Sequence, residues 1–314
     1  MNEVIIEASG LTKSFPGRVV AVKDLDLEVK RGMVYGLIGR NASGKTTTLR
    51  LLLGLLQPDC GEARILGWNF WRAPRAVRSR VGYVCQSQSL PEAMTLEQLC
   101  WYLGRCYERW DSGYARQMAE RWNLPWRSPL GHLSNGRQRQ AAILLAFAAR
   151  PEVVVLDEPA AGLDPVARRE VLEEMIEALG QNDGCTVLLS THLISDLERV
   201  ADHIGILDRG RMALSLSLES LLQQFKRVQV IFRGEATPAD FVVPGALSPV
   251  RRSGPVLQTI VRWTHDHELD ALRGAVDARV QVFPMGLEEI FIELFGSHTS
   301  GAVSVISQVP MNAS

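Results

Sequence analysis

One stretch, Gly39–Thr46, limits more than any other what this chain can fold into. It reads Gly-Arg-Asn-Ala-Ser-Gly-Lys-Thr and fits the pattern G-x-x-x-x-G-K-[ST]. The apolar run Val34–Ile38 precedes it as a short buried strand, and Thr47–Leu53 follows as the start of a buried helix. A glycine-containing loop between a strand and a helix wraps a phosphate chain, because its N–H groups and the helix N-terminus point at the anion. The stretch therefore predicts a nucleotide-binding site.

Two side chains of this loop have expected roles in that site. Lys45 can reach the β- and γ-phosphates of a nucleotide, and the hydroxyl of Thr46 can ligate Mg²⁺. The alternative is a glycine-rich turn that binds nothing, which the strand before the loop and the helix after it disfavour.

The composition limits the other functions open to the chain. Its 314 residues, 46% of them hydrophobic, suffice for a sizeable core and two domains. A formal net charge of -1 gives no electrostatic footprint for nucleic acid or an anionic membrane, and the arginines of 72–80 are typical of a solvated face.

Five cysteines without zinc spacing indicate free thiols in a reducing compartment. Without a signal peptide or an apolar run of about 20 residues, we expect a soluble, cytoplasmic protein; a membrane role would need a partner with the spanning helices.

The chain changes character at about residue 86. Before it, short β-rich runs alternate with turns; a turn is expected at Ser14–Gly17, and strands at Glu62–Leu66 and Val81–Cys85. Within that turn, Phe15 could stack on a nucleotide base or anchor the turn, and this residue alone does not decide between the two. From 86 to about 150 helical periodicity replaces the β signal, which predicts an inserted helical subdomain whose tryptophans, and Tyr102, are packing residues.

A second phosphate-binding candidate lies at the end of this helical region. Leu133–Gln140 reads Leu-Ser-Asn-Gly-Arg-Gln-Arg-Gln and leads directly into the apolar stretch Ala141–Ala149. Ser134 is a good N-cap, so the helix begins with free N–H groups and the positive end of its dipole. The plain interpretation is a capped helix. The sharper one is a helix terminus that presents Ser134 and Gly136 to a phosphate.

Two later strands end in polar residues where a parallel sheet would place a ligand. The apolar run Val153–Leu156 ends in Asp157 and Glu158, and such strands carry ligands at their carboxyl ends. Asp157 is then placed to hold Mg²⁺ and Glu158 to polarise an attacking water, the alternative being two solvated carboxylates. The buried strand that starts at Thr186 ends in His192, which is either a structural histidine or a γ-phosphate sensor.

The last third of the chain has no nucleotide motif. An amphipathic linker helix is expected over 214–226, followed by short strands at Val228–Phe232, Thr259–Trp263 and Val280–Phe283. Apolar residues at i, i+3, i+4 and i+7 from Leu287 predict a helix that covers this sheet. His265 and His267 are expected to be surface residues. The Ser/Gly/Val/Asn-rich segment 297–314 is expected to be frayed.

Taken together, these motifs resemble the ATP-binding subunit of ABC transporters, and the resemblance covers about residues 3–212 with every family motif in order. Gly39–Thr46 matches Walker A, Leu133–Arg137 the family signature, and Val153–Glu158 Walker B with its catalytic glutamate. By the same resemblance Phe15 corresponds to the adenine-stacking aromatic, Gln86 to the glutamine that senses Mg²⁺ and the membrane partner, Ala161–Asp164 to the D-loop, and His192 to the switch histidine.

The resemblance implies a fold. We expect an α/β P-loop ABC-type ATPase domain over 1–213, with a mixed sheet core, an antiparallel β subdomain and a helical signature subdomain over about 87–150. After the linker helix over 214–226 we expect a small α+β domain over 227–296 and a disordered tail over 297–314.

The resemblance also implies a set of site residues and two bound species, ATP and Mg²⁺. The residues expected to bind the nucleotide are Phe15, Gly39, Arg40, Asn41, Ala42, Ser43, Gly44, Lys45, Thr46, Thr47, Gln86, Ser134, Gly136 and Asp157. The catalytic residues are expected to be Lys45, Gln86, Glu158 and His192, and the metal-binding residues Thr46, Gln86 and Asp157.

The family's mechanism implies partners. Two ATP-binding domains face each other head to tail, and each ATP lies between Walker A of one domain and the signature helix of the other. The second domain would be a second copy or a paralogue, and an integral membrane permease would dock near Gln86 and the residues after it. No nucleic acid is expected, and the subunit would lie on the inner face of the plasma membrane through its permease. The segment Met285–Phe291 is similar to the tail of ABC-2 type exporters.

Four positions depart from the family pattern. Arg40 and Ala42 replace the frequent Pro and Gly of Walker A, and Ala42 could perturb a tight turn. Asn135 and Arg137 replace Gly and Gln of the signature, although the serine and the second glycine that would contact phosphate remain. Since every hydrolytic residue is present, we expect an active ATPase.

Two other functions fit the sequence less well than that of a transporter subunit. A soluble ABC-type ATPase that acts on DNA or the ribosome usually has two ATP domains, a coiled-coil insertion or a basic arm, and this chain has none of these. A P-loop kinase of another family would leave the signature segment unexplained.

Overall fold

A computed structural model of the chain describes residues 3–17, 19–86, 90–181, 185–234, 237–238, 240–247, 250–263, 267–275 and 278–296. The chain divides into two compact units, Met1–Met212 and Ala213–Ser314, which are described separately below. Among the described residues, no helix combines the length and the apolar character needed to cross a bilayer.

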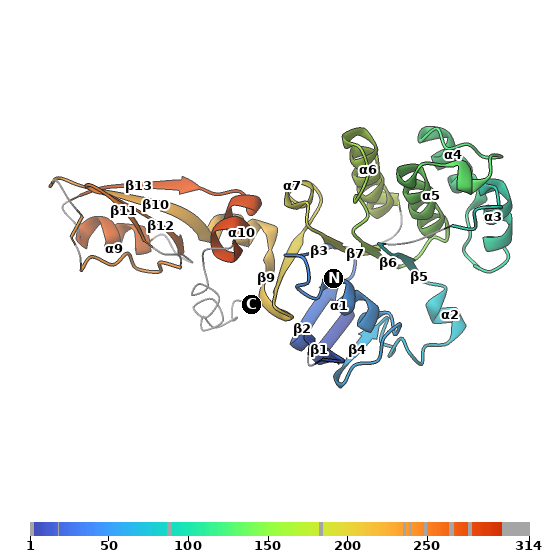
Figure 1. Ribbon diagram of the computed structural model, residues 1–314, viewed down its shortest axis with the longest axis horizontal. Coiled ribbons are helices and arrows are strands. Elements are labelled where there is room, and N and C mark those ends of the chain that lie inside the picture. The colour runs from blue at the N-terminus through green and yellow to red at the C-terminus, as the bar shows by residue number, and fades with distance from the viewer. Residues whose placement is uncertain are drawn as a thin grey trace. The chain divides into compact units, whose positions relative to one another are not determined.

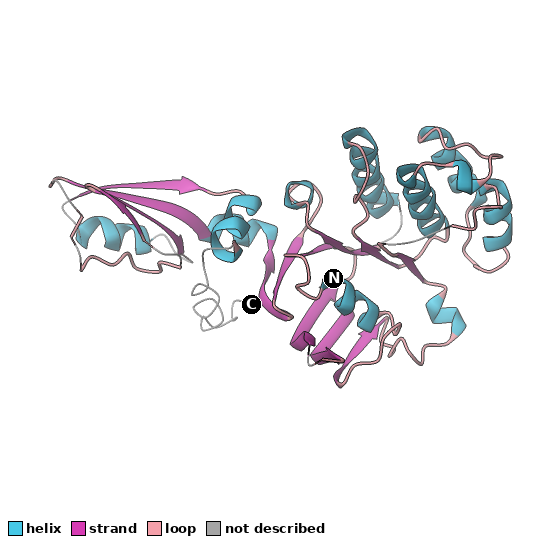
Figure 2. Cartoon of the chain, viewed as in Figure 1, coloured by secondary structure: helices cyan, strands magenta, loops and turns pink. Residues whose placement is uncertain are grey.

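A six-stranded sheet is the centre of the first unit (Figures 1 and 2). Its order is β5 (Val81–Val84), β6 (Val153–Asp157), β7 (Thr186–Thr191), β3 (Val34–Gly39), β8 (His203–Asp208) and β9 (Arg211–Ser217). The strands from β5 to β8 pair in parallel, and every residue of β3, β6 and β7 is buried. Continuous apolar strands of this kind suit a parallel sheet that is covered on both faces.

The turn between β8 and β9 reverses the chain. It consists of Arg209 and Gly210, with φ angles of 47° and 80°. Two positive φ angles in a two-residue loop are typical of a tight antiparallel hairpin, so the sheet is mixed, as expected. The backbone N–H of Gly210 donates to the carbonyl of Ser43 at 3.0 Å, which ties this turn to the loop after β3.

A separate antiparallel sheet has the order β2 (Val19–Lys30), β1 (Val4–Phe15), β4 (Cys60–Ile65). The turn predicted at Ser14–Gly17 begins later, because Ser14 and Phe15 still pair with β2. The β-rich runs Val19–Val22 and Leu25–Val29, which read in the sequence as two short strands, form the single strand β2. Asp24, at a φ of 49°, lies in a stretch where the pairing register shifts, so the buried positions jump from Val22 to Leu25 and the alternation looks interrupted.

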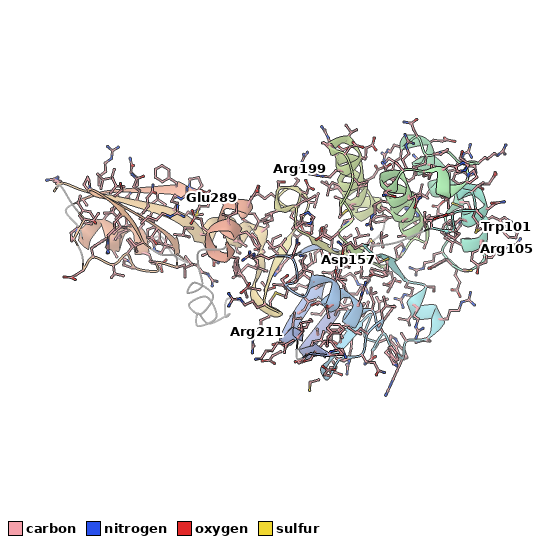
Figure 3. All side chains as sticks on the ribbon, viewed as in Figure 1. Trp101, Arg105, Asp157, Arg199, Arg211 and Glu289 are labelled. Atoms are coloured by element: carbon pink, nitrogen blue, oxygen red, sulfur yellow. The ribbon has the colours of Figure 1, made fainter. Side chains whose placement is uncertain are left out.

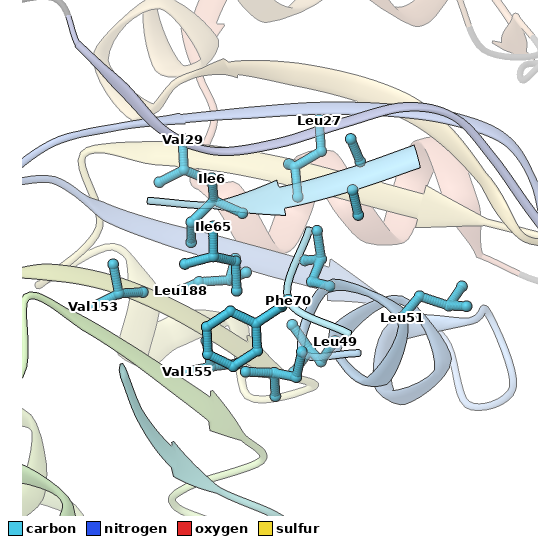
Figure 4. Packing of buried hydrophobic residues seen from close by; sticks show 14 of the residues in the cluster. Ile6, Leu27, Val29, Leu49, Leu51, Ile65, Phe70, Val153, Val155 and Leu188 are labelled. Carbon is cyan, nitrogen blue, oxygen red and sulfur yellow. The ribbon is translucent and has the colours of Figure 1, made fainter. Parts of the chain in front are cut away.

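The main core lies between this antiparallel sheet, helix α1 (Lys45–Leu52) and the central sheet (Figure 4). The antiparallel sheet contributes Ile6, Leu27 and Ile65 among others, α1 contributes Leu49, and the central sheet contributes Val155. Burial of a Leu or Ile side chain stabilises a fold by about 1.5–3 kcal/mol. This core fixes the position of the loop that connects β3 to α1.

Helices fill the rest of the unit. They are α2 (Arg75–Arg78), α3 (Leu96–Leu103), α4 (Ser112–Arg121), a 3-10 turn at Leu130–His132, α5 (Asn135–Ala148), α6 (Pro165–Gln181) and α7 (Ile194–Leu197). Four of them begin at side-chain N-caps that accept a backbone N–H: Thr95 caps α3, Asp111 caps α4, Ser134 caps α5 and Asp164 caps α6. The helical region predicted between 86 and 150 therefore holds α3, α4 and α5.

Two aromatic residues of this region are exposed. Trp122 is buried, but Trp101 is 63% exposed and Tyr102 is 55% exposed on α3. The guanidinium of Arg105 lies 4.2 Å from the centre of the Trp101 ring, and Figure 3 shows both residues at the outer edge of the unit. Helix α3 turns this face to solvent, so Trp101 and Tyr102 are not core residues of this unit, whereas their packing at an interface stays a prediction.

The second unit is built on an antiparallel sheet with the order β11 (Arg251–Ser253), β12 (Val256–Arg262), β10 (Phe225–Phe232), β13 (Ala278–Pro284). Its core includes Val228 and Val230 of β10 and Leu272 of α9 (His267–Ala275), a helix that the sequence analysis did not predict. The helix predicted from Leu287 is α10 (Leu287–Phe295). Its Glu293 pairs with Arg227 and Arg251, which lie on the sheet face opposite the valines.

The helix expected over 214–226 is much shorter than predicted. It is α8, Leu218–Gln224, and the residues before and after it belong to β9 and β10. Ser217 caps it by accepting the N–H of Ser220, and a side-chain cap at this point fixes where a helix begins. His265 and the segment 297–314 lie outside the described residues.

Candidate functional site

The loop between β3 and α1 has the geometry of a phosphate cradle. Gly44 adopts a φ of 106°, and a Cβ atom there would lie 2.4 Å from the carbonyl oxygen of Ala21. A Cβ on Gly39 would lie 2.4 Å from the hydroxyl of Ser43. Only glycine fits at these two positions. Ala42, which replaces a frequent glycine, also has a positive φ, of 62°.

A cleft of about 470 Å³ lies over this loop. It is lined by Val19, Val20, Ala21, Asn41–Thr47, Gln86 and Glu158. The structure thus brings together three separate predicted segments: the loop, Gln86, which lies two residues after β5, and Glu158, which directly follows β6. Val19 and Val20 were missed by the sequence analysis, although their exposure, 61% and 46%, makes an apolar wall available to a ligand such as a base.

The base-stacking role expected of Phe15 stays a prediction. This residue is 40% exposed at the end of β1, and it is not among the described residues that line the cleft. Its strand partner Val19 does line the cleft. Phe15 and the start of β2 therefore lie next to each other at this edge of the cleft.

Asp157 is the most buried charged group of the site, at 0% exposure. Its Oδ1 atom accepts hydrogen bonds from the Thr46 hydroxyl at 3.1 Å and from the Ser190 hydroxyl at 2.6 Å. Within the described part of the chain, its Oδ2 atom has no hydrogen-bond partner. A buried carboxylate oxygen without a partner, beside a threonine hydroxyl, fits the oxygen ligands that Mg²⁺ prefers. The residues present therefore fit the metal that the sequence predicted.

Lys45 and Glu158 face each other below the cleft. The Lys45 ammonium donates to the carbonyls of Gly39 at 2.7 Å and Arg40 at 3.3 Å, and lies 3.9 Å from Oε1 of Glu158. Burial lowers the pKa of Lys45, while the carboxylates of Glu158 and Asp157 act in the opposite direction. The ammonium group is positively charged, so a phosphate could replace these carbonyls as its hydrogen-bond acceptor.

His192 completes this group. Its Nδ1 atom lies 2.7 Å from Oε2 of Glu158, and its backbone N–H donates to the same oxygen at 3.4 Å. Glu158 itself has a φ of 52°, an uncommon value for this residue, and its N–H is held by the carbonyl and hydroxyl of Ser190. Such strained positions gather at functional sites. Ser190 was missed by the sequence analysis because its partners lie more than thirty positions away.

Ser134 and Gly136 lie apart from the phosphate-loop cleft. Ser134 is exposed and accepts the N–H of Arg137 at 3.4 Å, as an N-cap does. Gly136 lies against the 161–164 turn, where an added Cβ would be 3.4 Å from Leu163 Cδ2. Next to them is a second cleft of about 460 Å³, which is lined by Gln86, Asn135, Gln138, Arg139, Ala142, Ala161 and Gly162. Of the residues that the structure describes, Gln86 alone lines both of these clefts.

The first cleft has the groups that hydrolysis of a phosphoanhydride needs. A lysine and a ring of N–H groups can bind the phosphates, and Thr46 and Asp157 can hold a divalent cation. A carboxylate at the cleft wall can accept a proton from an attacking water, and a histidine beside it can orient that carboxylate. All four features come from the ends of neighbouring parallel strands.

Known proteins resemble both the sequence and the structure. Residues 22–161 match the family model described as ABC transporter. The chain is 30% identical to ABC transporter ATP-binding protein YtrB of Bacillus subtilis (strain 168), over 93% of this chain and 98% of that protein. It is 31% identical to Nod factor export ATP-binding protein I of Rhizobium sp. (strain N33), over 94% and 98%. Daunorubicin resistance ATP-binding protein DrrA3 of Streptomyces coeruleorubidus is 33% identical over 74% of this chain and 75% of its own.

Two solved structures share the fold of the first part of the chain. One is the ATP-binding subunit of an ABC transporter, with a TM-score of 0.62 and 29% identity over 70% of this chain and 92% of that one. The other is the ATP-binding cassette MJ0796 in a dimeric post-hydrolysis state bound to ADP and Pi, with a TM-score of 0.61 and 25% identity over 68% and 99%.

Proposed function

This chain belongs to the family of ABC transporter ATP-binding proteins, and we propose that it is the energising subunit of an exporter. It binds ATP and is an ATP hydrolase. Its work would be to couple each cycle of ATP binding and hydrolysis to a separate integral membrane permease, while it lies on the inner face of the plasma membrane.

Each group of the cleft has a proposed role in the chemistry. Glu158 accepts a proton from the attacking water, and His192 orients Glu158 and contacts the γ-phosphate. Lys45 leaves the carbonyls of Gly39 and Arg40 to bind the β- and γ-phosphates. Mg²⁺, when bound by Thr46, Asp157 and Gln86, neutralises charge on the phosphate oxygens.

A head-to-tail dimer of two ATP-binding domains is the proposed working form. Its support in this chain is the exposed N-terminus of α5, where Ser134 is separate from the phosphate-loop cleft of the same chain. Helix α5 is 14 residues long, and the N-terminus of such a helix can bind an anion. In a dimer, this anion would be the γ-phosphate of the ATP that the partner binds. The Asn135 and Arg137 departures leave Ser134 and Gly136 in place.

The exporter assignment is supported by relatives that match 94% and 74% of this chain. The names of two of them refer to Nod factor export and daunorubicin resistance, and the first match extends well beyond residue 212. For this chain we propose export without naming a substrate, because the permease would form most of the path that the substrate takes.

The proposed ATP hydrolysis rests mainly on the position of the Glu158 carboxylate, which lies between Lys45 and His192 at the wall of the cleft.

The proposed role in a transporter is tested by capture from native membranes in mild detergent, with a tagged Glu158→Gln chain and Mg·ATP to hold the closed state. We expect a multi-spanning protein in near-stoichiometric amount. Ribosomes or DNA-repair factors in its place, with the chain absent from membranes, would mean a soluble ATPase.

A further inference from the structure

Arg139 connects the helix that carries Ser134 to the residue that lines both clefts. It lies on α5, and its guanidinium donates to two consecutive backbone carbonyls, those of Cys85 and Gln86. Burial lowers the pKa of this guanidinium, and the carboxylates of Asp157 and Glu158 are near enough to act against that effect. Among the described residues no carboxylate comes within salt-bridge distance of Arg139, so these carbonyls are its anchor.

The contact adds a polar link between two elements that also pack together, since a Cβ on Gly82 of β5 would lie 3.2 Å from the carbonyl oxygen of Ala146 of α5. Cys85 and Gln86 follow β5 of the central sheet, whereas α5 belongs to the helical region. A planar guanidinium with several N–H donors can hold two adjacent carbonyls at once, which fixes direction as well as distance. The backbone of Gln86 is therefore held by α5 as well as by the strand before it.

The start of α5 is itself rigid. The Gln138 side chain donates to the carbonyls of Leu130 and Leu133, both at 3.2 Å, and Ser134 caps the helix. Ser134 and Arg139 are five residues apart, which is about 7.5 Å along a helix. Any shift of the helix N-terminus must therefore be transmitted to Arg139 with little loss.

We infer that Arg139 is a positioning residue that makes Gln86 follow the movement of Ser134. The inference rests on the proposed head-to-tail dimer, in which Ser134 contacts the ATP held by the partner while Gln86 acts in its own site. A phosphate that binds at Ser134 then determines the position of Gln86 relative to the metal and the γ-phosphate in the phosphate-loop cleft of the same chain. Arg139 thus couples the two ATP sites, and hydrolysis at one depends on occupancy of the other.

Three variants of the full chain test this coupling. Arg139→Gln removes the charge, and Arg139→Lys keeps the charge but not the planar fork. Arg116→Gln is the matched control: it makes the same chemical change on α4, where Arg116 pairs with Glu120 and stacks on Trp126. For each variant, hydrolysis is measured against ATP concentration, and ATP binding without turnover is measured in the Glu158→Gln background.

We expect the parent to show a Hill coefficient above 1 and at most 2 for both hydrolysis and binding. Arg139→Gln should reduce it to about 1, Arg139→Lys should give an intermediate value, and Arg116→Gln should match the parent. A variant that is merely less stable loses turnover but keeps its Hill coefficient, which thermal unfolding of the same samples makes visible. If Arg139→Gln retains the cooperativity of the parent, the inference is wrong.

A double-mutant cycle asks whether Arg139 acts through Gln86. In a Gln86→Ala background, Arg139→Gln should change turnover and the Hill coefficient no further, because the residue it positions is already gone. Additive losses would overturn the inference. A failure of the dimer itself looks different: the parent would bind ATP with a Hill coefficient of 1, and Glu158→Gln would stay monomeric with ATP. That result refutes the proposed function and this coupling together, before any Arg139 variant is made.

Discussion

Nδ1 of His192 lies 2.7 Å from Oε2 of Glu158, although the two residues follow different strands and are separated by 34 positions. Because β6 and β7 are parallel neighbours, their carboxyl ends meet at one edge of the sheet. The imidazole therefore holds the carboxylate in one orientation beside Lys45. We therefore expect the loss of the Glu158 carboxylate to cause the largest reduction in turnover.

Glu158→Gln keeps the size of the side chain and removes its ability to accept a proton. We expect turnover to fall by about 10²- to 10⁴-fold, while ATP binding persists and an ATP-dependent dimer accumulates on size-exclusion chromatography. Glu62→Gln, an exposed carboxylate on β4, serves as the control and should leave turnover at the level of the parent. Hydrolysis at the parent rate by the Glu158 variant would show that another group is the base.

The Asp157–Ser190 contact should control affinity for the metal. Ser190→Ala leaves Thr46 and Asp157 in place but removes the 2.6 Å hydrogen bond that orients the carboxylate. Loss of such a supporting contact weakens metal binding by about 10- to 100-fold. We expect the Mg²⁺ concentration for half-maximal hydrolysis, and the Mn²⁺ affinity measured by paramagnetic resonance in the presence of ATP, to change by that factor. Equal Mn²⁺ affinity in parent and variant would rule out this role for Ser190.

Ala42→Gly should stabilise the protein. Alanine at a φ of 62° is strained by about 1–2 kcal/mol, and the extra freedom of glycine in the unfolded chain offsets about 0.5–1 kcal/mol of the relief. The free energy of unfolding should rise by up to about 1 kcal/mol in a urea titration. Ala119→Gly, within helix α4, is the control and should lower it by at least about 1 kcal/mol, because glycine disfavours the helix and the buried methyl group is also lost. A destabilised Ala42 variant would mean that the methyl group makes contacts worth more than the strain.

Glu152 gives the first unit an acid-sensitive contact. Arg80 donates two hydrogen bonds to its carboxylate, both at 2.7 Å, and Arg109 and Arg31 also pair with it. These partners, Arg80 foremost, lower the pKa of Glu152 from 4.5 to about 2. Because the folded-state pKa is the lower one, the stabilisation is complete above pH 4.5 and is lost as the pH falls toward 2.

The variant Glu152→Gln exposes this pH dependence. It should be less stable than the parent at neutral pH by about 1–3 kcal/mol, and the difference should shrink as the pH is lowered through the same range. Urea unfolding of parent and variant at pH 7, 4.5 and 3 measures it. A difference that is constant with pH would mean that the arginines stabilise the fold without favouring the ionised carboxylate.

The sequence could predict those parts of the site in which one short segment contains both the helix or strand and the residues that act at its end. The phosphate loop, the Asp157–Glu158 pair and the capped helix at Ser134 are of this kind, since each motif includes its strand or its cap. Ser190, Val19 and Arg139 were not predicted, because each acts through a partner that only the folded chain brings near. Local pattern failed for the same reason at 214–226, where pairing in two sheets overrode an amphipathic helical signal.

The carbonyl oxygen of Ala21, on β2, lies close to both the phosphate loop and the turn between β8 and β9. A Cβ on Gly44 would lie 2.4 Å from it, and a Cβ on Gly210, in the turn between β8 and β9, would lie 2.8 Å from it. Both residues have positive φ angles. In evolutionary terms, selection for ATP binding therefore acts on Gly210 as firmly as on Gly44, although Gly210 touches no phosphate. Across homologous chains we expect glycine at both positions, and a larger residue at either only where the strand that carries Ala21 has shifted.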